Sequence, residues 1–162
     1  MKKLLTIALL LLTVLAAGAQ GKWTVFHREA DPMKGQDERD VYIYDAPGIG
    51  SVVVWDWKKA DFRLISEKGM FRKWVSSGST FVPVKVGLFD ENGKMEKMVE
   101  VRLCPEDNHN NYIMTFGWYM LGRSDIKKII SRLKKGKGYL RFVATLYNQP
   151  DFDMIVTPFE KE

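Results

Sequence analysis

The stretch SDIKKIISRLKKGKGYLRFVATLY, Ser124 to Tyr147, decides the fold because it joins a basic amphipathic helix to a strongly apolar strand. Its first half carries four apolar residues at the spacing i, i+3, i+4 and i+7, which is one face of a helix. These residues are Ile126, Ile129, Ile130 and Leu133. Ser124 is a suitable N-cap, and Gly136 is a typical stop signal. The pattern predicts one helix near residues 124–135 that packs through its apolar face.

Outside this stretch, short segments rich in Val, Ile, Tyr, Phe and Trp lie between turn-forming residues, which is typical of β-strands. The predicted strands are Trp23–His27, Val41–Asp45, Ser51–Trp57, Phe62–Ser66, Phe81–Phe89, Lys97–Cys104, Tyr112–Tyr119, Tyr139–Tyr147 and Phe152–Pro158. Many strands and one late helix predict a mainly β protein. We expect an antiparallel β-sandwich, of either the jelly-roll or the immunoglobulin-like type, that carries the helix across one end or edge.

Two of the turns between these segments are predicted to form hairpins. Asp90-Glu91-Asn92-Gly93 separates two apolar runs, and Asn and Gly tolerate the positive φ of tight turns. The segment Trp57–Asp61 is expected to turn a second hairpin. In Met98–Leu103, apolar and charged residues alternate, which predicts a strand with one face in the core and the other in water.

The N-terminus has the pattern of a secretory signal peptide. Lys2 and Lys3 precede an apolar run, Leu4 to Ala16, that is too short to span a membrane, and small residues follow at 17–19. Residues 1–19 are therefore predicted to be removed, so that the mature chain begins at Gln20 and forms a single β-sandwich domain over residues 20–162. We expect an exported protein, periplasmic or extracellular, with no transmembrane segment in the mature chain.

Charge and cysteine content narrow the classes of function. Removing Lys2 and Lys3 lowers the formal charge from +5 by two, to +3, which is too modest to indicate nucleic-acid binding. Cys104 is the only cysteine, so no internal disulfide can form. The glycine-rich and serine-centred fingerprints of nucleotide-binding proteins and hydrolases are absent from the sequence. No cofactor is predicted.

Two polar clusters are candidate sites for chemistry. Cys104 and His109, in CPEDNHNN, are a candidate nucleophile and base, and Asp107 with His109 is a candidate metal pair. The spacing matches no zinc signature, and a polar hairpin loop explains this segment better. Near the mature N-terminus, His27, Glu29 and Asp31 lie at alternate positions, where an extended chain would present them together, although the following Pro32 and Gly35 indicate a loop. No catalytic or metal-binding residue is assigned.

Exposed tryptophans and the lysines of the helix form the candidate ligand or partner surface. Trp55 and Trp57 are expected to share one strand face, and we expect Trp55 and Trp118 to belong to the core. The predicted surface consists of Trp57, Trp74, Lys127, Lys134 and Lys135. Aromatic rings there would suit sugar stacking or a protein interface. The alternative is that these lysines, like Lys128, simply form the solvated face of a structural helix, and we favour this interpretation.

The order of features in the chain resembles that of a known class of proteins. A Trp at the mature start, DPMKGQDERDVYIY, FRLIS, VPVKVGLFDENGK and the helix before KKGKGYLRF follow one another as they do in small exported β-sandwich proteins of Gram-negative bacteria. The pattern is similar to the invasion-associated locus B type, to accessory type VI secretion proteins and to uncharacterised exported proteins of gut bacteria. This resemblance implies no catalytic residue.

Two functions follow from the sequence. The favoured one is an exported, non-enzymatic binding or accessory module of the bacterial envelope, whose partner is another envelope protein or a glycan. The alternative is a small hydrolase that uses Cys104 with His109, or the cluster of His27, Glu29 and Asp31. Burial and orientation of these side chains separate the two hypotheses.

Overall fold

The structure is a computed structural model. It describes residues 21–58, 61–67, 71, 82–105, 113–115, 123–145 and 152–160, with the backbone alone at 103–105, 113–115 and 123. The predicted signal peptide lies outside these residues.

The predicted strands are all present in the described chain. The elements are β1 (Lys22–Arg28), the 3-10 helix η1 (Pro32–Lys34), β2 (Arg39–Ala46), β3 (Gly50–Asp56), β4 (Asp61–Ser66), β5 (Val82–Phe89), β6 (Met95–Pro105), β7 (Ile113–Thr115), α3 (Arg123–Lys135), β8 (Tyr139–Ala144) and β9 (Phe152–Val156). The helix begins one residue before the predicted cap Ser124 and ends before Gly136, as predicted.

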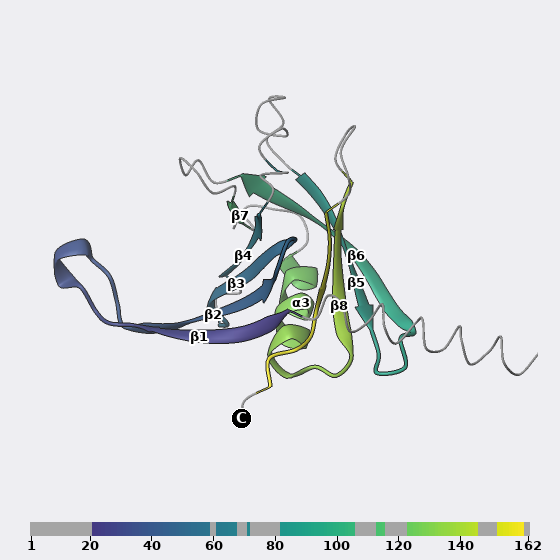
Figure 1. Cartoon of the computed structure of the whole chain (residues 1–162), viewed down its shortest axis with the longest axis horizontal. Coiled ribbons are helices and arrows are strands. Elements are labelled where there is room, and N and C mark those ends of the chain that lie inside the picture. The colour runs from purple at the N-terminus through teal and green to yellow at the C-terminus, as the bar shows by residue number, and fades with distance from the viewer. Residues whose placement is uncertain are drawn as a thin grey trace, which may run out of the picture.

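All strand pairs are antiparallel, and the strand order is β1-β2-β3-β4-β7-β6-β5-β8-β9 (Figure 1). Two four-stranded groups, β1-β2-β3-β4 and β6-β5-β8-β9, are joined through the short strand β7. The protein is therefore mainly β and antiparallel with one helix, as the sequence predicts. The finer prediction, a sandwich with jelly-roll or immunoglobulin-like order, is not confirmed by this topology.

The two predicted hairpins are confirmed. β5 and β6 pair across residues 90–93, where Gly93 adopts a φ of 77°. The Asp90 carboxylate accepts hydrogen bonds from the backbone N–H groups of Asn92 and Lys94, at 2.9 and 2.8 Å. β3 and β4 pair around the second turn. Local turn chemistry therefore fixes the register of the β5–β6 hairpin.

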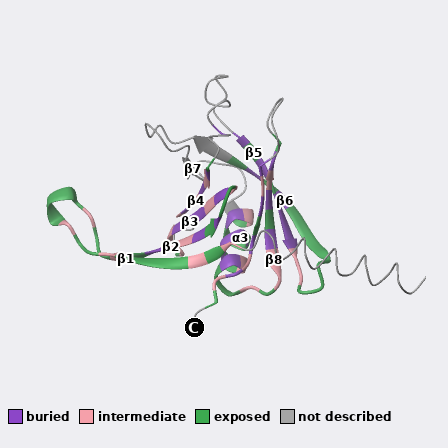
Figure 2. Cartoon of the chain, viewed as in Figure 1, coloured by how far each residue is buried: buried purple, intermediate pink, exposed green. Residues whose placement is uncertain are grey.

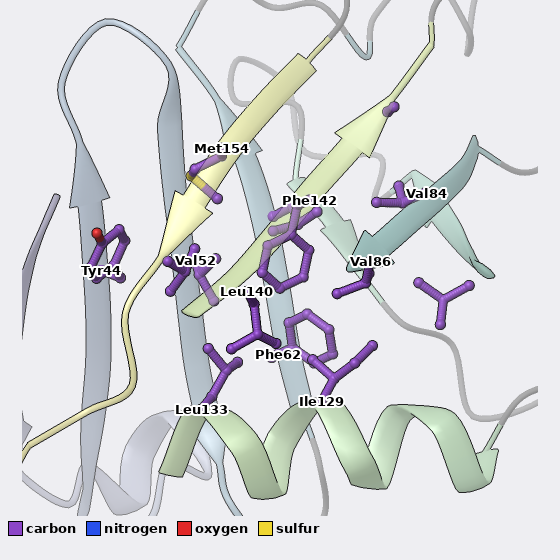
Figure 3. Packing of buried hydrophobic residues seen from close by; sticks show 14 of the residues in the cluster. Tyr44, Val52, Phe62, Val84, Val86, Ile129, Leu133, Leu140, Phe142 and Met154 are labelled. Carbon is purple, nitrogen blue, oxygen red and sulfur yellow. The ribbon is translucent and has the colours of Figure 1, made fainter. Parts of the chain in front are cut away.

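The apolar face of α3 forms one wall of the core, as predicted. Ile126, Ile129, Ile130 and Leu133 are all buried. Figure 3 shows Ile129 and Leu133 pointing from the helix toward Phe62, Leu140 and Phe142, which come from both four-stranded groups. The helix thus ties the two groups together, and burial of each such side chain contributes about 1.5 to 3 kcal/mol.

The β1–β2 hairpin projects from this body (Figure 1). At its tip, the Asp31 carboxylate caps η1 by accepting a hydrogen bond from the Met33 N–H at 3.2 Å, and Gly35 closes the turn with a φ of 60°. Figure 2 shows that this hairpin is mostly exposed, whereas the strands around α3 are mostly buried. Its outer strand, β1, is the first strand of the sheet order, so it forms an edge of the sheet.

Among the described residues, no helix combines the length and the apolar composition that crossing a membrane requires.

Candidate functional site: an aromatic groove beside the end of the helix

Two adjoining cavities lie between the β1–β2 hairpin and the C-terminal end of α3. Their volumes are about 530 and 710 Å³, and both are lined by Asp40, Tyr42 and Lys134. We call them together the aromatic groove. The remaining lining residues are Trp23, Val25, Asp37, Glu38, Arg39, Trp55, Asp56, Trp57, Lys58, Lys135, Phe159 and Glu160. The groove therefore combines apolar rings with charges of both signs.

Four half-buried rings form the apolar part of the groove: Trp23, Tyr42, Trp57 and Phe159. The Tyr42 ring lies edge-on to Trp57 and to Phe159, with centroids 5.2 and 5.0 Å apart. Trp23 contacts Phe159 and Trp57 at 5.7 and 6.1 Å. Edge-to-face contacts of this kind are favourable beyond the area that they bury. One side of the cluster rests on the core, so its position is fixed.

Strand register explains why these rings meet. In the β1–β2 pair, Trp23 lies opposite Tyr44, and Tyr42 follows two residues along the same face of β2. The pairing of β3 with β4 shifts between Val54 and Asp56, and β3 ends at Asp56. Trp57 therefore escapes the strict alternation of the strand and packs against Tyr42.

Two hydrogen bonds hold the C-terminal segment 157–160 in the groove. The Trp23 Nε1–H donates to the Thr157 carbonyl at 2.7 Å. The Phe159 N–H donates to the Leu133 carbonyl in the last turn of α3, also at 2.7 Å. These two bonds join β1, the C-terminal end of α3 and the segment 157–160 at one place. They also bring the Phe159 ring into contact with the other three rings.

Lys134 and Lys135 stand on the helix side of the groove, in the last turn of α3. Both are exposed, as predicted, and positive charge is favourable at this end of a helix dipole. Within the part of the chain that the structure describes, neither lysine has an ion-pair partner. They are therefore free to meet an anionic group in the groove.

The other lysines of the helix have different surroundings. Lys128 lies 3.2 Å from the Asp125 carboxylate, and Lys97 of β6 lies 3.3 Å from the same group. These hydrogen bonds, from Lys128 first and then Lys97, lower the pKa of Asp125. Lys127 is exposed but does not line the groove. The structure therefore joins Trp57, Lys134 and Lys135 in one site and leaves Lys127 outside it.

Trp55 differs from its prediction in two ways. It is half-buried rather than a core residue. Its ring also contacts two arginines, whereas the Trp57 ring contacts Trp23 and Tyr42, although both tryptophans line the smaller cavity. The guanidinium groups of Arg63 and Arg28 lie 4.9 and 5.8 Å from the centre of its ring, on the face opposite to the core residue Phe62. The bulge that turns Trp57 toward the groove leaves Trp55 between two cations, where cation–π attraction replaces burial.

The predicted cluster of His27, Glu29 and Asp31 is only partly formed. The His27 ring lies 3.0 Å from Asp40 and 3.5 Å from Glu38, both on the opposite side of the hairpin. The hydrogen bond to Asp40 is the main cause that raises the pKa of His27, and Glu29 adds only the smallest contribution. Asp31 instead caps η1 and pairs with Lys34. β1 ends at Arg28, so strand alternation no longer applies to the two acids.

The remaining candidates lie wholly or partly outside the described residues. His109, Asp107, Trp74 and Trp118 are not described, and Cys104 is placed only by its backbone, which pairs with Thr115 in β7. In the described ranges, no three His, Cys, Asp or Glu side chains lie close enough to hold a metal ion.

Sequence reasoning missed Trp23, Tyr42 and Phe159 as members of the site. Trp23 and Tyr42 lie in predicted strands, but the sequence does not reveal which strand faces meet. Phe159 follows the last predicted strand and carries no local signal. Only the pairing of β1 with β2 and the bond from Phe159 to the helix end bring these rings together.

Comparison of the chain with protein-family models, with curated protein sequences and with solved structures gives no match. The function is therefore inferred from the geometry of the aromatic groove and from the sequence.

Proposed function

We propose that the protein is an exported, non-enzymatic binding module of the bacterial envelope and that the aromatic groove is its binding surface. The observation that carries this proposal is the junction of the four half-buried rings with Lys134 and Lys135. Ligand sites are usually concave and lined by apolar and aromatic side chains with a few polar groups. The groove has this composition, and its rings are held in place by the core beneath them.

The sequence supports the export of the protein. Residues 1–19 have the three-part pattern of a signal peptide, and the order of motifs resembles that of exported proteins of Gram-negative bacteria. We place the mature chain in the periplasm or outside the cell. We also keep the β-sandwich as a proposed architecture, in which the two four-stranded groups would form the two layers and the helix would lie across one end or edge.

A partner for this groove is another envelope protein or a glycan. Both classes offer apolar or ring surfaces for the four rings and polar groups for the lysines. A catalytic role for the His27 cluster is less well supported, because the His27 side chain is 57% exposed and its described partners are two carboxylates. That arrangement is typical of a solvated strand surface rather than of a water-excluding catalytic site.

The binding proposal is tested by titrating residues 20–162 with two probes, an acidic oligosaccharide such as oligogalacturonate and an acidic extended peptide, while backbone amide shifts are followed by NMR. We expect shifts at Tyr42, Trp57 and Lys134, and we expect Trp57→Ala to abolish them. If neither probe moves these amides, the groove is not the binding surface.

Phe89→Ala is the matched control, because it removes another half-buried ring, stacked on Tyr139 at a centroid distance of 4.7 Å, that does not line the groove. It should leave binding unchanged. Equal losses in Trp57→Ala and Phe89→Ala would mean that both variants act through the fold, which contradicts the proposal.

A further inference from the structure

The edge strand β1 has one side that no described strand covers. It pairs with β2, and no strand in the described ranges pairs with its other edge. None of its seven residues is buried, and the side chains of Val25 and Phe26 are 44% and 54% exposed. A long, apolar and exposed strand edge is a template for another strand, and proteins usually shield such edges.

This free edge borders the aromatic groove. Trp23 and Val25 line the groove, whereas Phe26 and Arg28 point to the opposite face because side chains alternate along a strand. An extended chain that paired with β1 would alternate in the same way. Every second side chain would enter the groove beside Trp23 and Val25, and the others would lie beside Phe26 and Arg28.

The charges around this edge favour an acidic occupant. Lys134 and Lys135 face the groove, and Lys22 and Arg28 flank the two ends of β1. In the described part of the chain, none of these four cations has an ion-pair partner. The larger cavity, which borders β1, has the acids Asp40 and Glu160, and Asp40 is already hydrogen-bonded to His27 at 3.0 Å. The other acids of the groove, Asp37, Glu38 and Asp56, line the smaller cavity together with Arg39 and Lys58.

We propose that the edge of β1 and the aromatic groove together accept an extended acidic segment of a partner protein, which adds to the sheet as a strand. Main-chain hydrogen bonds to β1 would supply affinity, and alternate apolar side chains in the groove would supply specificity. This inference rests on the proposed binding function and names its partner class. A saccharide would use the rings but would leave the strand edge unpaired.

A second copy of the chain fits this edge less well. If two β1 strands paired antiparallel about Val25, Lys22 of each copy would lie opposite Arg28 of the other. Like charges directly opposite each other destabilise a strand pair. The same two cations attract a strand that carries acids at those positions.

The test uses a capped seven-residue peptide in which valines and glutamates alternate. Its matched control has lysines in place of the glutamates. Hydrogen exchange of the protein, measured residue by residue, should slow at the outward-facing amides of Lys22–Arg28 when the acidic peptide is present. We expect the lysine peptide to bind at least about tenfold more weakly, since like-charge contacts replace attractive ones. The double variant Lys22→Glu, Arg28→Glu, on the face of β1 where the glutamates would lie, should reverse this preference or remove it.

Two further peptides test the main-chain hydrogen bonds, because N-methylation removes backbone donors without changing the side chains. Methylation of every second nitrogen along one edge should abolish binding, and methylation along the other edge should leave it intact. Equal binding of both methylated forms, or no slowing of exchange in β1 with any peptide, overturns the strand-addition proposal.

The oligogalacturonate probe separates this failure from failure of the binding function. If it binds in a Trp57-dependent manner while the acidic peptide leaves β1 unprotected, the groove is a glycan site and only the present inference is wrong. If neither probe binds, the binding function fails as well.

Discussion

The two edge strands of this sheet have opposite characters. In β9, Phe152, Met154 and Val156 are buried and alternate with less buried residues, and Asp153 is bonded to Arg141 of the neighbouring strand. In β1, no residue is buried. Both strands end the same sheet, so position in the topology does not explain the difference.

The difference lies in what stands behind each strand. β9 belongs to the group that packs on α3, so that its inner side chains meet the core. β1 continues into the projecting hairpin, and only its N-terminal end, through Trp23, rests on the core. One edge stabilises the protein, and the other is left accessible. Substitutions in the two regions should therefore differ in their effects on stability and on binding.

The largest effect is expected from Ile130→Asp in α3, the helix on which the β9 group packs. Ile130 is 5% exposed, and a carboxylate there would have no described polar partner. Burial of an unpaired charge destabilises strongly, so we expect a loss of more than about 4 kcal/mol and an insoluble or unfolded product. Circular dichroism and solubility measure this, and Lys127→Asp, at an exposed site of the same helix, is the control. A folded Ile130→Asp protein would mean that α3 does not hold the core.

One substitution in each edge strand tests how much β9 and β1 contribute to the free energy of unfolding. Met154→Ala in β9 removes a side chain with 0% exposure and should lower the free energy of unfolding by about 2 to 5 kcal/mol. Val25→Ala in β1 removes a partly exposed side chain and should change it by only about 0.5 kcal/mol. Urea denaturation of both variants measures the difference. Similar losses would show that β1 supports the core as much as β9 does.

A smaller effect is expected where β1 does touch the body. Trp23→Phe keeps a ring in the aromatic cluster but removes the 2.7 Å hydrogen bond from Nε1 to the Thr157 carbonyl. We expect a loss of about 1 kcal/mol, together with faster hydrogen exchange at residue 159. Trp57→Phe, which removes no described hydrogen bond, controls for the change of ring size. Unchanged exchange at residue 159 would contradict the role of this bond.

Charge reversal on the outer face of α3 should have little effect on stability. Lys127, Lys134 and Lys135 are exposed, and exposed charges contribute about 0 to 1 kcal/mol each, with a similar small term from the helix dipole. Reversal of all three to Glu should therefore leave Tm nearly unchanged, while reversal of Lys134 and Lys135 removes binding of an acidic probe. A large fall in Tm, measured by calorimetry, would show that these lysines are structural.

The smallest effect concerns His27 at the base of the hairpin. The hydrogen bond to Asp40 raises the pKa of His27 above 6.5 in the folded state. The protonated ring is therefore favoured by folding. Its contribution is fully present below the unfolded pKa of 6.5 and is lost as pH rises through the folded pKa. His27→Gln should thus destabilise the protein more at about pH 5 than at about pH 8.

Chemical denaturation at the two pH values measures this difference, and Met33→Gln, at an exposed position of the same hairpin, is the control. The opposite order, with the larger loss at the higher pH, would contradict the pairing of His27 with Asp40.

The sequence predicts the elements of this fold well because each depends on local chemistry. The stripe from Ile126 to Leu133 indicates a helix by its spacing alone, and Asp90–Gly93 specifies a hairpin by its turn residues. The arrangement of the elements depends on contacts between distant segments. No local pattern reveals that β7 joins the two four-stranded groups, so the strand order could not be derived from the sequence.

In the candidate site, too, some features depend on local sequence and others depend on contacts between distant segments. The exposure of Lys134 and Lys135 follows from helix periodicity, and it was predicted. The position of Trp57 depends on a one-residue irregularity in the pairing of β3 with β4, which reverses the face that simple alternation assigns. The same irregularity explains why Trp55 is not a core residue. A bulge of this kind is set by the partner strand and by packing, and strand periodicity within β3 does not reveal it.

The bond between the Phe159 N–H and the Leu133 carbonyl has a consequence for the order in which the molecule matures. Residues 21–156 contain every strand and the helix of the described chain, but they lack the ring of Phe159 that completes the groove. A chain that emerges from its N-terminus onward can form its sheet and its helix before it can form this site. The proposed binding surface can therefore be completed only after the described strands and helix have been made, and a chain that stops before Phe159 lacks part of it.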